Sequence, residues 1–280
     1  MLPPRKRKRI ELSAELTPAP PEQPLDRRLA LGMAFGAFGI VFILWQTESA
    51  LLFPFRLMVT FVHEMGHGLA AVLTGGQFVS FHVFGDGSGV AFTDGGIREA
   101  IIPAGYLGTA LFGALLLYAA NRIRRPQWVA FFCGAFFITS SLIFGGGGTW
   151  HIAAAISSFF AIAIGMFSGI ALIALGRYAN RVVTVFVLNT LAFIVGFNVF
   201  SDFLWLTAYQ GAKVGDIVND AQAMAQLTGA PVMTWIVIWT AAAILMMGIA
   251  VILAFVEPAP RPSSAAGGEE AAQDEVIHGI

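Results

Sequence analysis

Long apolar stretches separated by short polar segments constrain this chain more than any other feature of its sequence. A helix that crosses the hydrocarbon core of a bilayer needs about 20 consecutive, predominantly apolar residues. Stretches of about this length cover residues 29–45, 51–74, 100–120, 127–144, 149–175, 182–209 and 231–256. We therefore predict an all-α polytopic membrane protein with about seven transmembrane helices.

The composition agrees with this fold class and excludes an ordinary soluble domain. Hydrophobic residues make up 57% of the 280 residues and charged residues only 12%, whereas soluble domains contain about 25% charged residues. Cys133 is the single cysteine, which excludes a disulfide framework and a cysteine metal cluster.

Most charges lie in the two ends of the chain. Residues 1–28 are rich in proline, lysine and arginine, and residues 257–280 are rich in small and acidic residues. We expect both segments to be disordered tails that flank a membrane domain at 29–256. A basic segment before a first span is typical of a cytoplasmic anchor. The sequence therefore predicts the lipid bilayer as a partner, a cytoplasmic N-terminus and no nucleic-acid partner.

The predicted number of crossings conflicts with the distribution of basic residues. With seven full crossings and a cytoplasmic N-terminus, the basic segment 121–125 would face the other side, against the positive-inside tendency. One solution is that residues 100–120, which Pro103, Gly105 and Gly108 interrupt, do not cross fully. The sequence leaves this question open.

The segment after the second apolar stretch has a different residue pattern. The β-branched and aromatic runs 78–84 and 90–93 flank the glycine-rich segment 85–89. This pattern predicts a short β-hairpin at about 78–95, too short to cross a membrane. His82 alternates with aromatic residues in the first run, and we expect it at the surface.

The second stretch contains the motif His63-Glu64-Met65-Gly66-His67. A helix places His63 and His67 on one face, one turn apart, where both imidazoles can bind one Zn²⁺ ion. Glu64 can then act as general base on a water that the metal activates. Each ionisable group inside an apolar span costs roughly 2.5–3.5 kcal/mol. This cost favours a bound metal over an accidental polar face.

The run from His63 to Gly68, followed by a hairpin, resembles the site-2 protease family of intramembrane zinc metalloproteases, in its divergent bacterial and plant branch. The segment 103–108 is similar to a Gly-Tyr-Leu-Gly segment of that branch. The resemblance covers most of residues 51–256. It implies zinc-dependent hydrolysis of a membrane protein or peptide substrate within or near a membrane, here the bacterial inner membrane. It also implies that the hairpin presents an edge strand to an unwound substrate.

The third ligand of the predicted zinc site is less directly indicated. A catalytic zinc takes three protein ligands and one open position, and the Leu-Asp-Gly context of the main site-2 proteases is absent here. We predict Asp202, which lies inside an apolar stretch at a depth that matches His67. Asp220 is the alternative ligand, although its position favours a helix N-cap. Asp216 is expected in a loop.

Two other functions stay open beside a membrane-embedded zinc metalloprotease. The absence of Leu-Asp-Gly is compatible with a metal-binding scaffold or chaperone of the same fold without proteolytic activity. A metal or proton transporter could use His63, His67 and Asp202 as a relay. The chain contains no convincing internal repeat of the kind common in transporters.

Overall fold

The computed structural model describes residues 26–146, 152–208, 213–214 and 217–256. Side chains are described for all of these except 152–157, 198–208, 213–214 and 217–218. The predicted tails at 1–28 and 257–280 lie almost entirely outside the described residues.

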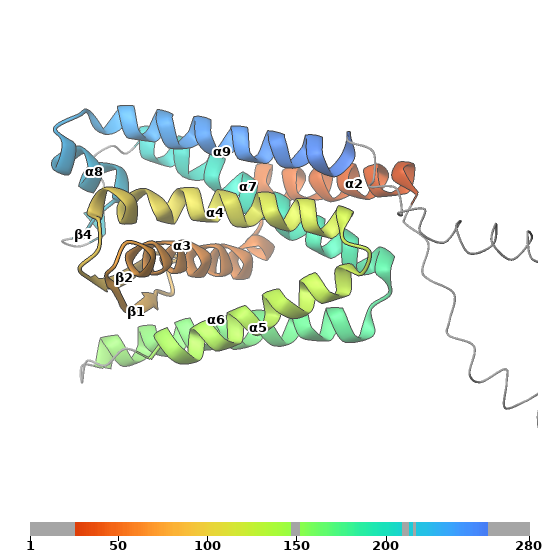
Figure 1. Ribbon diagram of the computed structural model, residues 1–280, viewed down its shortest axis with the longest axis horizontal. Coiled ribbons are helices and arrows are strands. Elements are labelled where there is room, and N and C mark those ends of the chain that lie inside the picture. The colour runs from red at the N-terminus through yellow and green to blue at the C-terminus, as the bar shows by residue number, and fades with distance from the viewer. Residues whose placement is uncertain (1–25, 147–151, 209–212, 215–216, 257–280) are drawn as a thin grey trace, which may run out of the picture.

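Long helices occupy each of the predicted apolar stretches (Figure 1). They are α2 (Arg27–Gln46), α3 (Phe53–Leu73), α4 (Arg98–Arg122), α5 (Pro126–Phe144), α6 (Ile152–Tyr178), α7 (Arg181–Ala208) and α9 (Val232–Phe255). The shorter elements are the 3-10 helix η1 (Ala50–Leu52), helix α8 (Asp220–Thr228), and strands β1 (Gln77–Val83), β2 (Gly89–Asp94), β3 (Lys213–Val214) and β4 (Ile217–Val218). The β3–β4 pair and α8 fall in the segment after α7, for which the sequence predicted no strands.

Among the described residues, five helices are long and apolar enough to cross a membrane: α2, α4, α5, the part of α6 from Ser158 to Tyr178, and α9. This is fewer than the seven predicted. The polar side chains of the His-Glu-x-x-His motif and Arg56 lower the hydropathy of α3. The fully described part of α7, Arg181–Phe197, is too short. The fold class itself is confirmed: the protein is an integral membrane protein, all-α apart from small β-hairpins.

Helix α4 lies at the centre of the bundle, where it contacts α3, α7, α8 and α9. Glycines permit its closest contact with α3, because a Cβ at Gly66 would overlap the Ala104 carbonyl oxygen and one at Gly108 would lie 3.3 Å from the Gly66 Cα. Small residues at helix interfaces let backbones approach closely inside a membrane. The α3–α4 interface is therefore a backbone contact rather than an interdigitation of large side chains.

The predicted hairpin is present and packs on α3, α5 and α6. In its turn, the Asp86 carboxylate accepts a hydrogen bond from the Ser88 backbone N–H at 2.9 Å, and Gly87 adopts a positive φ of 95°. The Thr60 hydroxyl in α3 donates to the Gly87 carbonyl at 2.7 Å. The hairpin is thus attached to the helix that carries the histidines. His82 was expected at the surface, but it is buried, with its ring edge-on to Phe92.

Side-chain contacts establish the direction of α2. Phe38 contacts Phe193, and Trp45, further along α2, contacts Phe197, further along α7. The two helices therefore run parallel. The early part of α7 lies beside the end of α4, since the Asn121 amide donates to the Asn189 side-chain carbonyl at 2.7 Å.

Helix α4 runs opposite to both α7 and α3. Gly113 lies against Val195, whereas Asn121 pairs with the earlier residue Asn189. On the other side, the start of α4 lies beside the end of α3. It follows that α2 and α3 run in the same direction, as Figure 1 also shows.

This direction resolves the conflict over charge. The α4–α5 turn, with Arg122, Arg124 and Arg125, lies at the same end of the bundle as the start of α2 (Figure 1). The solution suggested from sequence, an incomplete crossing by residues 100–120, is wrong. Helix α4 continues over 25 residues with Pro103 inside it. Seven full crossings would require α2 and α3 to run in opposite directions, whereas in the structure they run in the same direction.

Single cysteines in a Cys133→Ser background test this topology. We expect Arg28→Cys and Arg124→Cys to react with a membrane-impermeant maleimide from the same side of sealed vesicles. Asp94→Cys, exposed at the end of β2 beside Gly76, should react from the other side. Reaction of positions 28 and 124 from opposite sides would contradict parallel α2 and α3. The Cys133→Ser protein without a new cysteine is the control.

Candidate metal centre

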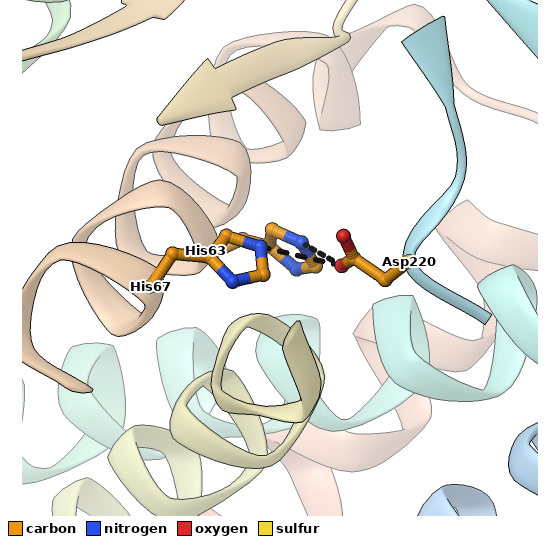
Figure 2. Close-up of side chains that lie close together, drawn as sticks. All are labelled: His63, His67 and Asp220. Carbon is orange, nitrogen blue, oxygen red and sulfur yellow. Dashed lines mark hydrogen bonds and ion pairs between the residues drawn. The ribbon is translucent and has the colours of Figure 1, made fainter. Parts of the chain in front are cut away.

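His63 and His67 lie on consecutive turns of α3 and face the same side of the helix (Figure 2). Their ring centroids are 4.8 Å apart, and the planes are nearly perpendicular at 77°. His67 is buried and His63 is half-buried. As the spacing of four residues predicts, both imidazoles lie on one face of the helix and are close together.

The Asp220 carboxylate meets both imidazoles. Its Oδ2 atom lies 2.9 Å from His63 Nε2 and 3.3 Å from His67 Nε2. One donor atom from each of the three residues lies within 4.8 Å of the others. Ligand atoms around a tetrahedral zinc with bonds of about 2.0–2.1 Å stand about 3.3 Å apart. The three side chains therefore form a group of a size that a metal ion could occupy.

The start of α8 determines the position of Asp220. Asn219 is the N-cap, and its side-chain oxygen accepts the Gln222 backbone N–H at 2.9 Å. Asp220 is therefore the first residue of the helix rather than its N-cap, which corrects the prediction from sequence. Asn219 satisfies the helix end, so the Asp220 carboxylate is directed toward α3.

Apolar packing holds α8 in this position. Ala221 and Met224 are buried in a cluster with Ile102 of α4 and with Ile236 and Trp239 of α9. This cluster fixes the start of α8 against the same helix that packs on His63 and His67. The third side chain of the group is thus positioned by contacts between three helices.

The charge state of Asp220 suits a metal ligand. Burial acts to raise the pKa of this carboxyl, but the two adjacent imidazoles outweigh burial and hold its pKa well below the usual range. The carboxylate is therefore ionised at neutral pH and supplies a negative charge to the site.

His67 is oriented by a backbone group. Its Nδ1 atom lies 2.7 Å from the Ile101 carbonyl oxygen, which can only accept, so Nδ1 carries the proton. In the neutral ring, Nε2 then presents a lone pair toward Asp220 Oδ2. The Nε2 and Oδ2 atoms, 3.3 Å apart, attract each other when a proton on the nitrogen or a metal cation lies between them. The donor set therefore fits a metal ion, and the Ile101 carbonyl supplies the outer hydrogen bond typical of ligating histidines.

Gly105 keeps the space beside the two imidazoles open. A Cβ at this position would overlap the Nε2 atoms of both His63 and His67. The backbone of α4 therefore forms one wall of the group, and any side chain at residue 105 would fill the volume next to both nitrogens.

Glu64 is buried beside this group but turns toward the hairpin. The Ala91 backbone N–H of β2 hydrogen-bonds to its carboxylate. A Cβ at Gly89 would lie 2.6 Å from Glu64 Oε1. Glycine at 89 thus lets the strand approach the carboxylate, and the backbone amide at 91 holds it.

Tyr106 completes the wall on the α4 side. Its ring stands edge-on to the His63 imidazole, with centroids 4.8 Å apart, and stacks on Trp239 at 5.8 Å. Sequence reasoning singled out neither Tyr106 nor Gly105 as site residues. Both lie in the segment 103–108, whose resemblance to a family segment was the available signal.

The predicted third ligand, Asp202, lies in α7 but outside the residues whose side chains are described. Its role therefore stays a prediction. Asp216 lies outside the described residues. The alternative ligand, Asp220, is the carboxylate that the structure places at His63 and His67.

Replacement of Gly105 by alanine tests the open space. We expect Gly105→Ala to abolish metal binding, because the new methyl group would overlap both imidazole nitrogens. Gly113→Ala is the matched control on the same helix, since its Cβ would lie 2.9 Å from Val195 Cγ1 and far along the helix from the histidines. Metal content of the purified proteins, measured by mass spectrometry of the ions, decides the outcome. Equal metal content in both variants would contradict the proposed wall.

One family model matches the chain, described as Peptidase M50B-like, over residues 35–250. Neither a curated protein nor a solved structure matches it. The matched residues include His63, His67 and Asp220 and most of the membrane helices. The chain therefore belongs to the M50B-like peptidases, the site-2 protease family of membrane proteins.

Proposed function

We propose that this protein is a zinc metallopeptidase that hydrolyses peptide bonds of a membrane protein or peptide within or near the bilayer. The observation that carries the proposal is the convergence of His63, His67 and Asp220 beside the buried carboxylate of Glu64. Membership of a peptidase family supports the reaction class. We further propose the bacterial inner membrane, with the start of α2 on the cytoplasmic side.

His63, His67 and Asp220 would hold the zinc ion. Two imidazoles and one carboxylate form a ligand set of catalytic zinc sites, which keep one further position open. When bound, zinc supplies a Lewis acid that polarises a carbonyl group and makes water nucleophilic at neutral pH. Asp220 would contribute the negative charge, and the Ile101 carbonyl would accept the Nδ1 proton, which leaves Nε2 as the ligating nitrogen of His67.

Glu64 is the proposed general base. It would take a proton from the attacking water and deliver a proton to the leaving amine. The Ala91 backbone N–H fixes its carboxylate. Because Glu64 follows His63 directly in the helix, the base and the ligands share one rigid element.

Strand β2 is the proposed platform for the substrate. The Ala91 amide that bonds to Glu64 is directed away from β1, so this edge of the strand faces the proposed base. An unwound peptide that added to this edge would place its backbone beside Glu64. The Thr60 to Gly87 hydrogen bond would keep the hairpin aligned with α3.

The identity of the third ligand is tested by zinc content. We expect about one zinc per chain in the wild type and in Asp202→Ala, and loss of zinc in Asp220→Ala. The reason is that Asp220 Oδ2 lies within 3.3 Å of both imidazole nitrogens. Loss of zinc in Asp202→Ala alone would instead support the ligand first predicted from the sequence.

Glu64→Gln separates a peptidase from a metal-binding scaffold. We expect this variant to retain zinc but to lose activity by about 10²–10⁴-fold, the usual contribution of a general base. Hydrolysis of fluorescently labelled casein in detergent provides the assay. Glu99→Gln, at an exposed position in the first turn of α4, is the control. A zinc-loaded wild type with no more hydrolysis than Glu64→Gln would favour the scaffold.

A further inference from the structure

An apolar cavity of about 710 Å³ lies between α2, α7 and α9, with one residue of α4 in its wall. Its lining is mainly aromatic and aliphatic, including Phe35, Phe38, Phe197, Ile244, Met247 and Phe255. None of the metal-centre residues lines it. Its volume falls within the range of about 300–1,000 Å³ that is typical of small-molecule sites.

The surroundings determine what can fill this cavity. Thr240 supplies the only polar side chain among the residues that line it. Phe35 and Ile244 are exposed, so the cavity is open to the outside of the bundle, and water finds too few polar partners there. In a bilayer, lipid acyl chains are the apolar molecules that can fill such a cavity.

Arginines stand at one end of the cavity. Arg27 and Arg28 form the first turn of α2 and are exposed. Leu31, one turn later, lines the cavity together with Phe35. Residues four apart lie on one face of a helix, so Arg27 lies above Leu31 on the face that borders the cavity. Figure 1 shows this part of α2 beside the last turns of α9.

The same end of the bundle is strongly basic. The α4–α5 turn adds Arg122, Arg124 and Arg125, and the α6–α7 turn adds Arg177 and Arg181. Among the described residues, Asp26 is the one acidic residue at this end. A cluster of arginines next to a membrane helix attracts anionic headgroups, by an amount that grows with each charge. The charge at the mouth therefore complements an anionic lipid.

We propose that the cavity binds an acyl chain of an anionic phospholipid whose phosphate is held by Arg27 and Arg28. Guanidinium groups bind phosphate through paired hydrogen bonds. The bound chain fills the space between α2 and α9 and joins the first helix to the bundle. The site is independent of the proposed peptidase activity, because it shares no residue with the metal centre.

The test uses the full chain in detergent, titrated with phosphatidylglycerol or with phosphatidylcholine that has the same acyl chains, and native mass spectrometry to count bound lipid. We expect tighter binding of phosphatidylglycerol. Gly248→Leu should abolish binding, because Gly248 lines the cavity and a Cβ there meets nothing within 4 Å. Gly36→Leu is the matched control, since its Cβ also meets nothing and it does not line the cavity.

A second pair of variants separates the site from the general charge of this end. Arg27→Gln with Arg28→Gln should weaken phosphatidylglycerol binding about tenfold, from the loss of two charges near the headgroup. Arg124→Gln with Arg125→Gln removes the same charge away from the residues that line the cavity and should weaken binding much less. These exposed positions do not contribute to the core, so the comparison stands even if Gly248→Leu does not fold.

Several outcomes would overturn the proposal. Equal binding of the two lipids would exclude a role for the anionic headgroup. An equal loss in both arginine pairs would show only a general attraction of anionic lipid to this end of the bundle. Unchanged phosphatidylglycerol binding in a folded Gly248→Leu protein would place the lipid elsewhere. A wild-type dimer that Gly248→Leu dissociates would assign the cavity to a second copy of the chain.

Discussion

The close backbone contact between α3 and α4 is the constraint on which the site depends. Lipid tails are as apolar as leucine, so helices inside a membrane associate through tight packing and polar contacts. Gly66 admits the Ala104 carbonyl, and Gly105 admits the two imidazoles. The same approach brings the Ile101 carbonyl to His67 Nδ1. Larger side chains at the two glycines would separate the helices and remove both the hydrogen bond and the open space beside the ligands.

The rest of the centre is built around this contact from elements that are distant in the sequence. Helix α8 packs on α4 and α9 and brings Asp220 to the histidines, whereas β2 brings the Ala91 amide to Glu64. Each buried ionisable group thus has a partner from another element, as buried polar groups require. The arrangement also separates roles, because α8 supplies charge to the imidazoles and the hairpin orients the neighbouring carboxylate.

The features that sequence could predict are local. Apolar length located the long helices, the glycine-rich turn located the hairpin, and helical spacing placed His63 and His67 on one face. The prediction of Asp202 rested on equal depth in parallel helices, and α3 and α7 do run parallel. Depth alone, however, could not reveal that α8 folds back onto α4. That contact depends on Met224, Ile236 and Trp239, which are not distinguished in sequence from other apolar residues of the chain. The direction of α2 was equally hidden, since it follows from aromatic contacts with α7.

The shared direction of α2 and α3 links the charge of the bundle to the position of its chemistry. The arginine-rich turns and the start of α2 lie at one end, whereas the hairpin, the start of α4 and α8 lie at the other (Figure 1). His67 lies less than two turns before the end of α3 at Leu73, on the side of the hairpin. With the arginine end in the cytoplasm, as we propose from the positive-inside tendency, the candidate metal centre would lie toward the opposite face. Under the proposed function, water and an unwound substrate would reach Glu64 from that face, past β2 and α8, while the basic end would contact anionic headgroups. The shared direction of α2 and α3 would thus place the proposed lipid site and the proposed hydrolysis at opposite ends of the bundle.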